Sequence, residues 1–252
     1  MIDADTLVAE VPGLMRYART IVRDQALAED LVQETLVRAL ERGHSFRGDS
    51  SLATWLHRIL HNAAVDHSRR HREEPTEDVT TLVEERWRDE RYSVDASVVT
   101  ARAETVEALK DSLLRLPLIY RTALVLHDME GLTMPQIARI QQVQLPAAKQ
   151  RLRRGRMLLV TALASQWERR VAIAGVPLTC WDARSRVSDY LDDTLAARER
   201  HLVETHLADC PTCPPLFDAL VQTRRCVGLL RDPDSTIPAD LVKRIVEASR
   251  AS

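Results

Sequence analysis

Residues 133–156, TMPQIARIQQVQLPAAKQRLRRGR, decide the fold class of this chain. Thr133 and Gln136 form a T-x-x-Q capping box, which predicts the start of a short helix that ends near Ile140. A polar turn follows, and Pro146 is suited to the first turn of a second, longer helix. A short helix, a tight turn and a longer basic helix are typical of a helix-turn-helix motif.

The longer helix carries a run of cations with no acidic residue among them. Ala148, Leu152, Leu159 and Leu163 are spaced to lie on its opposite face, so the helix can pack on one side and present its cations on the other. Such cations are suited to phosphates and base edges, although a solvated basic face is the simpler alternative. The capped helix before it favours DNA binding, and the candidate contacts are Lys149, Arg151, Arg153, Arg154 and Arg156.

Two more amphipathic helices are predicted upstream. Asp24 can cap the first, whose apolar positions run from Leu27 to Leu40, and Ser51 can cap the second, over residues 52–72. Side chains suited to base edges and phosphate recur at steps of three and four residues on the second helix and share one face. They are Arg58, Asn62, Arg69 and Arg72, with Arg70 beside them.

The first of these helices has an acidic stripe. Asp30 and Glu34 are four residues apart, with Gln33 adjacent, and they form either an ordinary solvated face or a patch for a basic protein partner. On the second helix, His57 and His61 have the spacing of metal ligands, as do His67 and His71. We interpret both pairs as solvated histidines.

Charge and helix breakers divide the rest of the chain. Residues 73–107 hold eleven acidic and four basic residues, include Pro75 and lack a sustained apolar stripe, so we predict a linker with at most a short helix in LVEERWRDERY. Residues 108–179 hold eleven basic and four acidic residues, which indicates one surface that meets phosphate. A connector is predicted at 166–179 and three or four further helices in 180–252, which makes the fold class all-α.

Two absences favour a cytoplasmic protein. No apolar run approaches the roughly 20 residues that cross a membrane, and the acidic N-terminus lacks the basic and apolar regions of a signal peptide. All four cysteines lie in the last 73 residues, and in a reducing compartment such a cluster is more often a metal site than a set of disulfides.

The cysteine cluster has the spacing of a zinc site. His206, Cys210 and Cys213 form H-x3-C-x2-C, and a helical hairpin that reverses at residues 192–194 would return the chain beside Cys180, the candidate fourth ligand. One zinc ion, structural or redox-sensing, is the favoured interpretation. A chance group of reduced cysteines and a metal-free C-x-x-C redox pair are the alternatives. Cys226 is left over as a buried thiol.

The predicted helices together resemble the extracytoplasmic-function (ECF) sigma factors, bacterial transcription initiation factors. The resemblance rests on ALAEDLVQETLVRAL, FRGDSSLATWLHRILHNAAVDHSRR, LPLIYRTALVLHDMEGLTMPQIARI and KQRLRRGRMLL, in the family's order and spacing. It implies two helical domains, at 1–72 and 108–165, joined by the linker 73–107. The implied partners are core RNA polymerase and promoter DNA.

The family also implies roles for individual residues. Asp30, Gln33 and Glu34 would bind core polymerase, and the helix from Pro146 would read the −35 promoter element. The −10 element would be melted and read by a loop and the helix that follows it, through Phe46, Arg47, Trp55, Arg58, Asn62, Asp66, Arg69 and Arg70.

Residues 180–213 resemble the zinc-binding anti-sigma domains, and TIPADLVKRIV at 236–246 resembles the helix that trails them. In that family the domain usually belongs to a separate protein that covers the polymerase-binding faces of its sigma factor. Here it is fused in cis, which predicts an intramolecular contact with the sigma domains and regulation of this chain by its own C-terminal domain.

Two other functions compete with a sigma factor. A helix-turn-helix regulator that acts without core polymerase, with a redox- or zinc-responsive domain, would have no use for the second base-reading segment at 46–70. A zinc or thiol enzyme is disfavoured because four N/S ligands leave a zinc ion no open position and the sequence has no nucleophile constellation, so we expect no enzyme activity.

Overall fold

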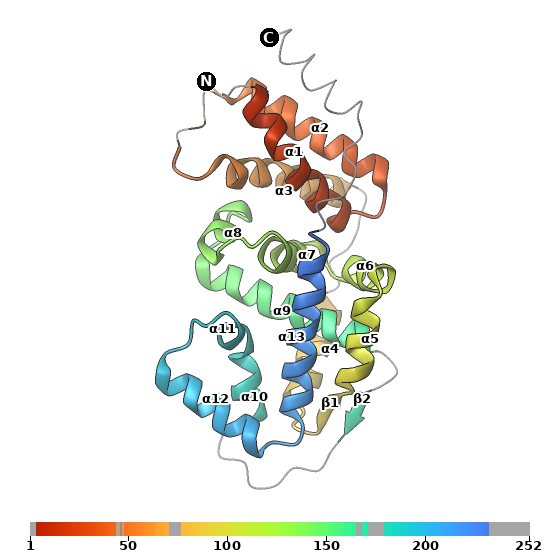
Figure 1. The fold of residues 1–252 in the computed structure, drawn as a ribbon, viewed down its shortest axis with the longest axis vertical. Coiled ribbons are helices and arrows are strands. Elements are labelled where there is room, and N and C mark those ends of the chain that lie inside the picture. Colours follow the sequence, from red (N-terminus) through yellow and green to blue (C-terminus); the bar gives the residue numbers. More distant parts are fainter. Residues whose placement is uncertain are drawn as a thin grey trace.

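The computed structural model describes residues 4–43, 46, 48–70, 77–164, 168–170 and 179–231. Three layers follow one another along its long axis (Figure 1). Helices α1–α3 form the N-terminal unit at one end, α6–α9 form the helix-turn-helix unit in the middle, and α10–α12 lie at the other end. The described residues are almost entirely helical, which confirms the all-α prediction.

The N-terminal unit consists of α1 (Ala4–Ile21), α2 (Gln25–Glu41) and α3 (Leu52–Arg70). As predicted, the Asp24 side chain accepts a hydrogen bond from the Ala26 backbone N–H and caps α2, and the Thr54 N–H donates to the Ser51 hydroxyl at the start of α3. The apolar faces of the three helices form a common core. Arg16 of α1 joins this unit to the middle layer through a bidentate ion pair with Glu130.

The helix-turn-helix unit contains α6 (Val106–Arg115), α7 (Leu118–Leu124), the π-helical turn η2 (Val125–Met129), α8 (Met134–Ile140) and α9 (Leu145–Ala164). The predicted capping box between Thr133 and Gln136 is present at the start of α8. A Cβ on Gly155 would lie only 2.8 Å from the Tyr120 carbonyl oxygen, so this glycine lets α9 pack directly on α7.

The linker predicted at 73–107 folds against the rest of the chain. It contains α4 (Glu77–Arg88), strand β1 (Tyr92–Val94) and α5 (Ala96–Glu104), and β1 pairs antiparallel with β2 (Glu168–Arg170) in the predicted connector. The Trp87 indole is fully buried and donates a hydrogen bond to the Thr161 hydroxyl of α9. The sparse apolar residues of this segment therefore suffice for docking, although they form no continuous stripe.

The C-terminal domain contains α10 (Cys180–Ser185), α11 (Val187–Leu191), α12 (Ala197–Asp209) and α13 (Cys213–Leu229). The hairpin is present, but a break at Arg186 splits its first arm into α10 and α11. Helix α13 leaves this domain and runs beside α5, η2 and α9 (Figure 1). None of the helices that the structure describes is both long and apolar enough to cross a membrane.

Candidate nucleic-acid interface and metal centre

The hairpin brings Cys180, His206, Cys210 and Cys213 together. One ligand atom from each lies within 4.8 Å of the other three, and all four residues are buried. The Sγ atoms of Cys180 and Cys210 are 3.6 Å apart, which is far longer than a disulfide bond of about 2.05 Å. It is close to the roughly 3.8 Å edge of a tetrahedron with Zn–S bonds of about 2.3 Å.

Helix ends place these four ligands. Cys180 begins α10, which Thr179 caps, and His206 lies in the last turn of α12. Cys210 ends α12 and Cys213 begins α13, so the Pro-Thr pair between them forms the turn. Cys226 is buried in α13, as predicted, and is not among the clustered residues.

The protein environment acts unequally on the three thiols. Burial raises the pKa of Cys213 and of Cys180. Burial also acts to raise the pKa of Cys210, but hydrogen bonds from Thr212 and the backbone outweigh it and lower that pKa. A bound cation would hold all three as thiolates, which is the form that ligates zinc.

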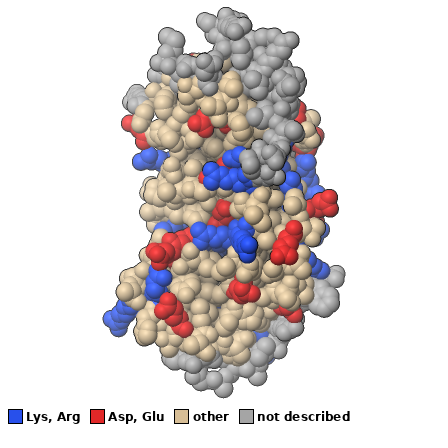
Figure 2. Space-filling view, viewed as in Figure 1, with Lys and Arg blue, Asp and Glu red and all other residues tan. Residues whose placement is uncertain are grey.

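The cations of α9 are engaged within the molecule. Lys149 Nζ lies 2.9 Å from Asp189 Oδ1 of the C-terminal domain. Arg154 Nε lies 2.6 Å from Glu84 Oε1 of α4, and the same carboxylate lies 3.5 Å from Arg153 Nη2. Figure 2 shows acidic side chains interspersed with the basic ones across the middle of the molecule, in place of an uninterrupted basic surface.

Arg156 is the most buried of these cations, with 2% of its side chain exposed. Its guanidinium lies 2.6 Å from Asp128 of η2 and 3.0 Å from Asp192 of the C-terminal domain. Burial alone would raise the pKa of Asp128, but the charge of Arg156 and hydrogen bonds from His127 and Arg156 lower it to about 2. Arg156 therefore connects the C-terminal domain to the core of the helix-turn-helix unit.

Arg151 and Arg153 complete the set on α9. Arg151 donates a hydrogen bond to the Gln141 side chain within the helix-turn-helix unit. The Arg153 guanidinium lies over the ring of Trp181, 5.3 Å from its centroid, and Trp181 is next in sequence to the candidate ligand Cys180. All five candidate −35 residues thus have an intramolecular partner.

The candidate −10 residues lie around α3. The ring of Phe46 packs against the ring of Trp55, with centroids 5.5 Å apart. Asn62 is half-buried and accepts a hydrogen bond from Gln142, in the turn between α8 and α9. The charged members Arg58, Asp66, Arg69 and Arg70 are exposed, and Arg47 lies outside the described residues, as does the trailing segment 236–246.

The interpretation of His57 and His61 as solvated was wrong. Each is only 4% exposed, because α3 turns this face toward α1 and the helix-turn-helix unit. The His57 ring packs on Tyr17 of α1 with centroids 5.2 Å apart. Burial, with a smaller contribution from the nearby charge of Arg151, lowers the pKa of His61 to about 4.

The acidic stripe of α2 has a different environment. Asp30 and Glu34 are exposed and Gln33 is half-buried. Glu34 makes an ion pair with Arg38 one turn along the same helix. In the described part of the chain, no residue of the C-terminal domain is paired with this face.

Three family models match the chain in succession. Residues 7–74 match Sigma-70 region 2, residues 107–159 match Sigma-70 region 4, and residues 180–213 match a family described as "Putative zinc-finger". The ECF RNA polymerase sigma factor SigM of Mycobacterium tuberculosis is 32% identical over 64% of this chain and 84% of its own length. The RNA polymerase sigma-H factor of Pseudomonas aeruginosa is 33% identical over 56% of this chain and 76% of its own length.

This chain belongs to the ECF sigma factor family. The family acts in transcription initiation, and membership favours the sigma factor over a regulator that works without polymerase. Its N-terminal unit is region 2, its helix-turn-helix unit is region 4, and its C-terminal domain is of the zinc-finger type. A solved complex of the sigma factor RpoE with the anti-sigma factor NepR from Bartonella quintana overlaps 64% of the chain, at 22% identity and a TM-score of 0.48.

The structure shows partners of the α9 cations that the sequence did not single out. Glu84, Asp189 and Asp192 pair with these cations, and Trp181 stacks on one of them. The one sequence signal of the three acidic partners is the charge of the linker and the hairpin, which does not identify partners 36 to 70 residues away.

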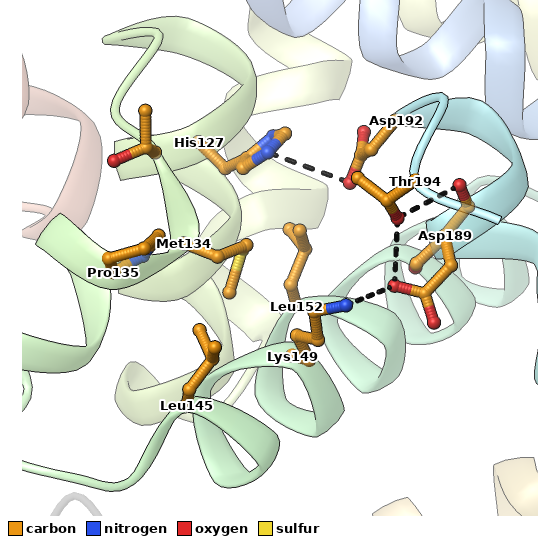
Figure 3. A pocket seen from close by; sticks show the side chains of 11 residues that line it. His127, Met134, Pro135, Leu145, Lys149, Leu152, Asp189, Asp192 and Thr194 are labelled. Atoms are coloured by element: carbon orange, nitrogen blue, oxygen red, sulfur yellow. Dashed lines mark hydrogen bonds and ion pairs between the residues drawn. The ribbon is translucent and has the colours of Figure 1, made fainter. Parts of the chain in front are cut away.

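A cavity of about 330 Å³ lies between region 4 and the zinc-finger domain (Figure 3). Met134, Leu145 and Leu152 give it an apolar wall, and the Lys149–Asp189 pair closes one side. At this cavity, the two domains leave space between their side chains, whereas the buried apolar residues of α13 belong to the common core.

Proposed function

We propose that this sigma factor is autoinhibited, with its zinc-finger domain and folded linker covering the helix that reads the −35 element. In this proposal α9 reads the −35 element, α3 and the loop before it melt and read the −10 element, and the acidic stripe of α2 binds core polymerase. The observation that carries the proposal is the pairing of the α9 cations with Glu84, Asp189 and Asp192. Phosphate binding requires the same cations, so DNA and these carboxylates compete for them.

Zinc is the proposed metal of the C-terminal domain. Three thiolates and one imidazole are the ligand set of closed structural zinc sites, and the clustering of one ligand atom from each residue within 4.8 Å supports this choice. In such a site the ion supplies a cross-link between the hairpin and α13 and has no open position for chemistry. Cys180, His206, Cys210 and Cys213 would hold it.

The relation of region 2 to region 4 also supports a closed state. The −10 and −35 elements are about 25 base pairs apart, or roughly 85 Å at 3.4 Å per base pair. Here Asn62 of the candidate −10 surface is 3.0 Å from Gln142 of the helix-turn-helix. The linker 73–107 could span roughly 115 Å if extended, so it is long enough for the promoter but must leave its docked position.

The covalent connection strengthens weak contacts. A short tether makes docking intramolecular, with an effective concentration in the mM range. The exposed Lys149–Asp189 pair contributes at most about 1 kcal/mol, so the closed state depends on many such contacts acting together. Core polymerase and promoter DNA can then compete with it without an extreme affinity.

Run-off transcription with core polymerase tests the proposal, comparing the full chain with a chain that ends at residue 170. We expect the shorter chain to give several-fold more transcript and to bind −35 DNA more tightly. Equal core binding by both chains would serve as the control. Reduced or abolished transcription from the shorter chain would contradict inhibition and show that the domain is a positive element.

A further inference from the structure

Arg184 of α10 is a fully buried cation that joins the zinc-finger domain to the linker. Its Nη1 donates to the backbone carbonyls of Trp87 at 2.7 Å and Asp89 at 3.0 Å, and its Nη2 donates to that of Tyr92 at 2.8 Å. These carbonyls belong to the end of α4 and the start of β1. One side chain thus supplies hydrogen bonds to the whole turn between them.

The other edge of the same guanidinium faces the metal centre. Arg184 Nε lies 3.3 Å from the Sγ atom of Cys213, and Nη2 lies 3.1 Å from the hydroxyl of Thr212. Thr212 lies between the two cysteines of the C-x-x-C turn. Its hydroxyl donates to the Glu90 carbonyl at 3.0 Å, and its own carbonyl accepts from the Ser93 hydroxyl at 3.2 Å. The metal-binding turn is therefore hydrogen-bonded directly to the linker.

Charge balance shows what Arg184 requires. Among the described residues no carboxylate forms an ion pair with it, and a buried cation is strongly destabilising unless it is compensated. Zinc held by three thiolates and a neutral imidazole would carry a net charge of −1, and one of these thiolates, Cys213, lies beside the guanidinium. A loaded metal site would thus supply the counter-ion for this buried arginine.

We propose that Arg184 is a positioning residue that makes docking of linker residues 87–93 depend on metal in the Cys180–His206–Cys210–Cys213 site. With metal bound, the guanidinium is compensated and holds the linker turn in place. Without metal, the compensation is lost and the turn is released. This inference rests on the zinc site proposed above, but not on whether the domain inhibits transcription.

The consequence reaches α9 through α4. Glu84 lies one helical turn before Trp87, and it pairs with both Arg153 and Arg154. Release of the turn at 87–93 would therefore remove the anchor of the carboxylate that covers these two cations. The path from the metal centre to the −35 helix runs through the linker, in addition to the direct contacts of Asp189 and Asp192.

Hydrogen–deuterium exchange of the full chain tests the coupling, with peptides covering 84–94 as the readout and peptides of α2 as the internal reference. In zinc-loaded protein the amides of 87–93 should be protected. Withdrawal of zinc by a chelator should raise their exchange rate at least about tenfold. Unchanged protection after complete zinc withdrawal, verified by metal analysis, would overturn the proposal.

Substitutions of Arg184 separate its charge from its hydrogen bonds. Arg184→Gln should deprotect 87–93 and lower zinc affinity about tenfold in chelator competition, because the coupling is reciprocal. Arg184→Lys should deprotect the turn but keep zinc affinity near that of the parent. Arg186→Gln, two residues along on the surface of the same domain, is the matched control and should change neither.

Two results guard against misfolding as an explanation. If Arg184→Gln does not fold, Thr212→Val removes the hydroxyl contacts with Glu90 and Arg184 and should deprotect the same turn. Zinc-loaded variants that retain the parent protection and zinc affinity would overturn the role of Arg184. Protein that never binds zinc would instead refute the metal site, and a failed truncation experiment would refute only the inhibition.

Discussion

Helices α2 and α9 carry two of the three predicted contact surfaces of this sigma factor, and their surroundings in the structure differ. The acidic stripe of α2, with Asp30 and Glu34, is exposed. The basic stripe of α9 is paired with carboxylates from the linker and the zinc-finger domain. Among the described residues, Asp30 and Glu34 of the proposed polymerase-binding surface are thus exposed, whereas the cations of the proposed DNA-binding helix are paired.

The difference indicates which step the closed state controls. If the proposed autoinhibition holds, a chain in this arrangement would meet core polymerase through α2 before α9 could bind phosphates. Binding to polymerase would then precede opening, and the C-terminal domain would act on promoter recognition and not on assembly. The carboxylates pair with the cations that the proposal assigns to phosphate binding, so they would compete with DNA for these side chains.

Loss of the metal should have the largest effect on the difference between the exposed α2 surface and the paired α9 surface. Cys210→Ser should reduce zinc from about one to near zero per monomer and unfold the hairpin, since structural zinc sites contribute on the order of 10 kcal/mol to folding. The α9 surface would then be uncovered while α2 is unaffected. Metal analysis and −35 DNA binding measure the two results, and Cys226→Ser, which removes a thiol outside the cluster, should leave zinc in place.

Acid should destabilise the packing between α3 and region 4. His61 has a folded-state pKa of about 4, below the roughly 6.5 of an unfolded histidine, so it is neutral in the folded protein. Its contribution is complete above pH 6.5 and is lost as the pH falls toward 4, because the unfolded chain binds the proton first. The loss amounts to roughly 3 kcal/mol.

Urea unfolding at pH 7.5 and pH 5 measures this dependence. His61→Gln should reduce it and leave the part that comes from His57, whose pKa burial also lowers, whereas His201→Gln, at an exposed position of α12, serves as the control. A parent protein whose free energy of unfolding is equal at both pH values would contradict the buried neutral state of His61.

The intramolecular pairing of α9 should reduce the effect that substitutions on this helix have on −35 DNA binding. In a chain ending at residue 170, Arg151→Ala or Arg154→Ala should weaken −35 binding by about 1–3 kcal/mol. In the full chain Arg154→Ala should have a smaller effect, because Arg184 of the C-terminal domain there holds the linker in place and Arg154 must first leave Glu84. Equal losses in both chains, measured by footprinting, would show that α9 is not covered in solution.

Charge reversal on the α2 surface should be detected in an assay of core-polymerase binding. Asp30→Lys combined with Glu34→Lys should weaken core-polymerase binding by about 1–2 kcal/mol, in keeping with exposed charges, and leave helix content unchanged. Glu204→Lys, an exposed acid on α12, is the matched control. Unaltered affinity in a pull-down titration would remove the assignment of this face.

Neutralising the two carboxylates of the C-terminal domain that pair with α9 should have the smallest effect. Asp189→Asn with Asp192→Asn should raise the affinity of the full chain for −35 DNA by a few-fold, about 1 kcal/mol, because α4 and Arg184 still hold the linker. Asp218→Asn, exposed on α13, should change nothing. If the double variant binds DNA no better than the parent, these two residues do not compete with phosphate.

Local sequence patterns predicted much of the fold and of the candidate metal centre. The capping box of Thr133 and Gln136, the cap by Asp24 and the long basic helix all involve residues within one or two turns of each other. The ligand spacing of His206, Cys210 and Cys213 is local in the same way. Even Cys180 was placed correctly, because two helical arms of similar length must return the chain to its starting point.

By itself, the sequence determined the helices, their caps, the sigma-type order of the units and the four clustered ligands. Only the tertiary structure decided which charges meet. Glu84 and Arg154 are 70 residues apart, and Arg184 reaches backbone carbonyls more than 90 residues away, contacts that no local pattern encodes. The burial of His57 and His61 was missed for the same reason: a helix face is exposed or buried according to what packs on it, and that depends on the rest of the chain.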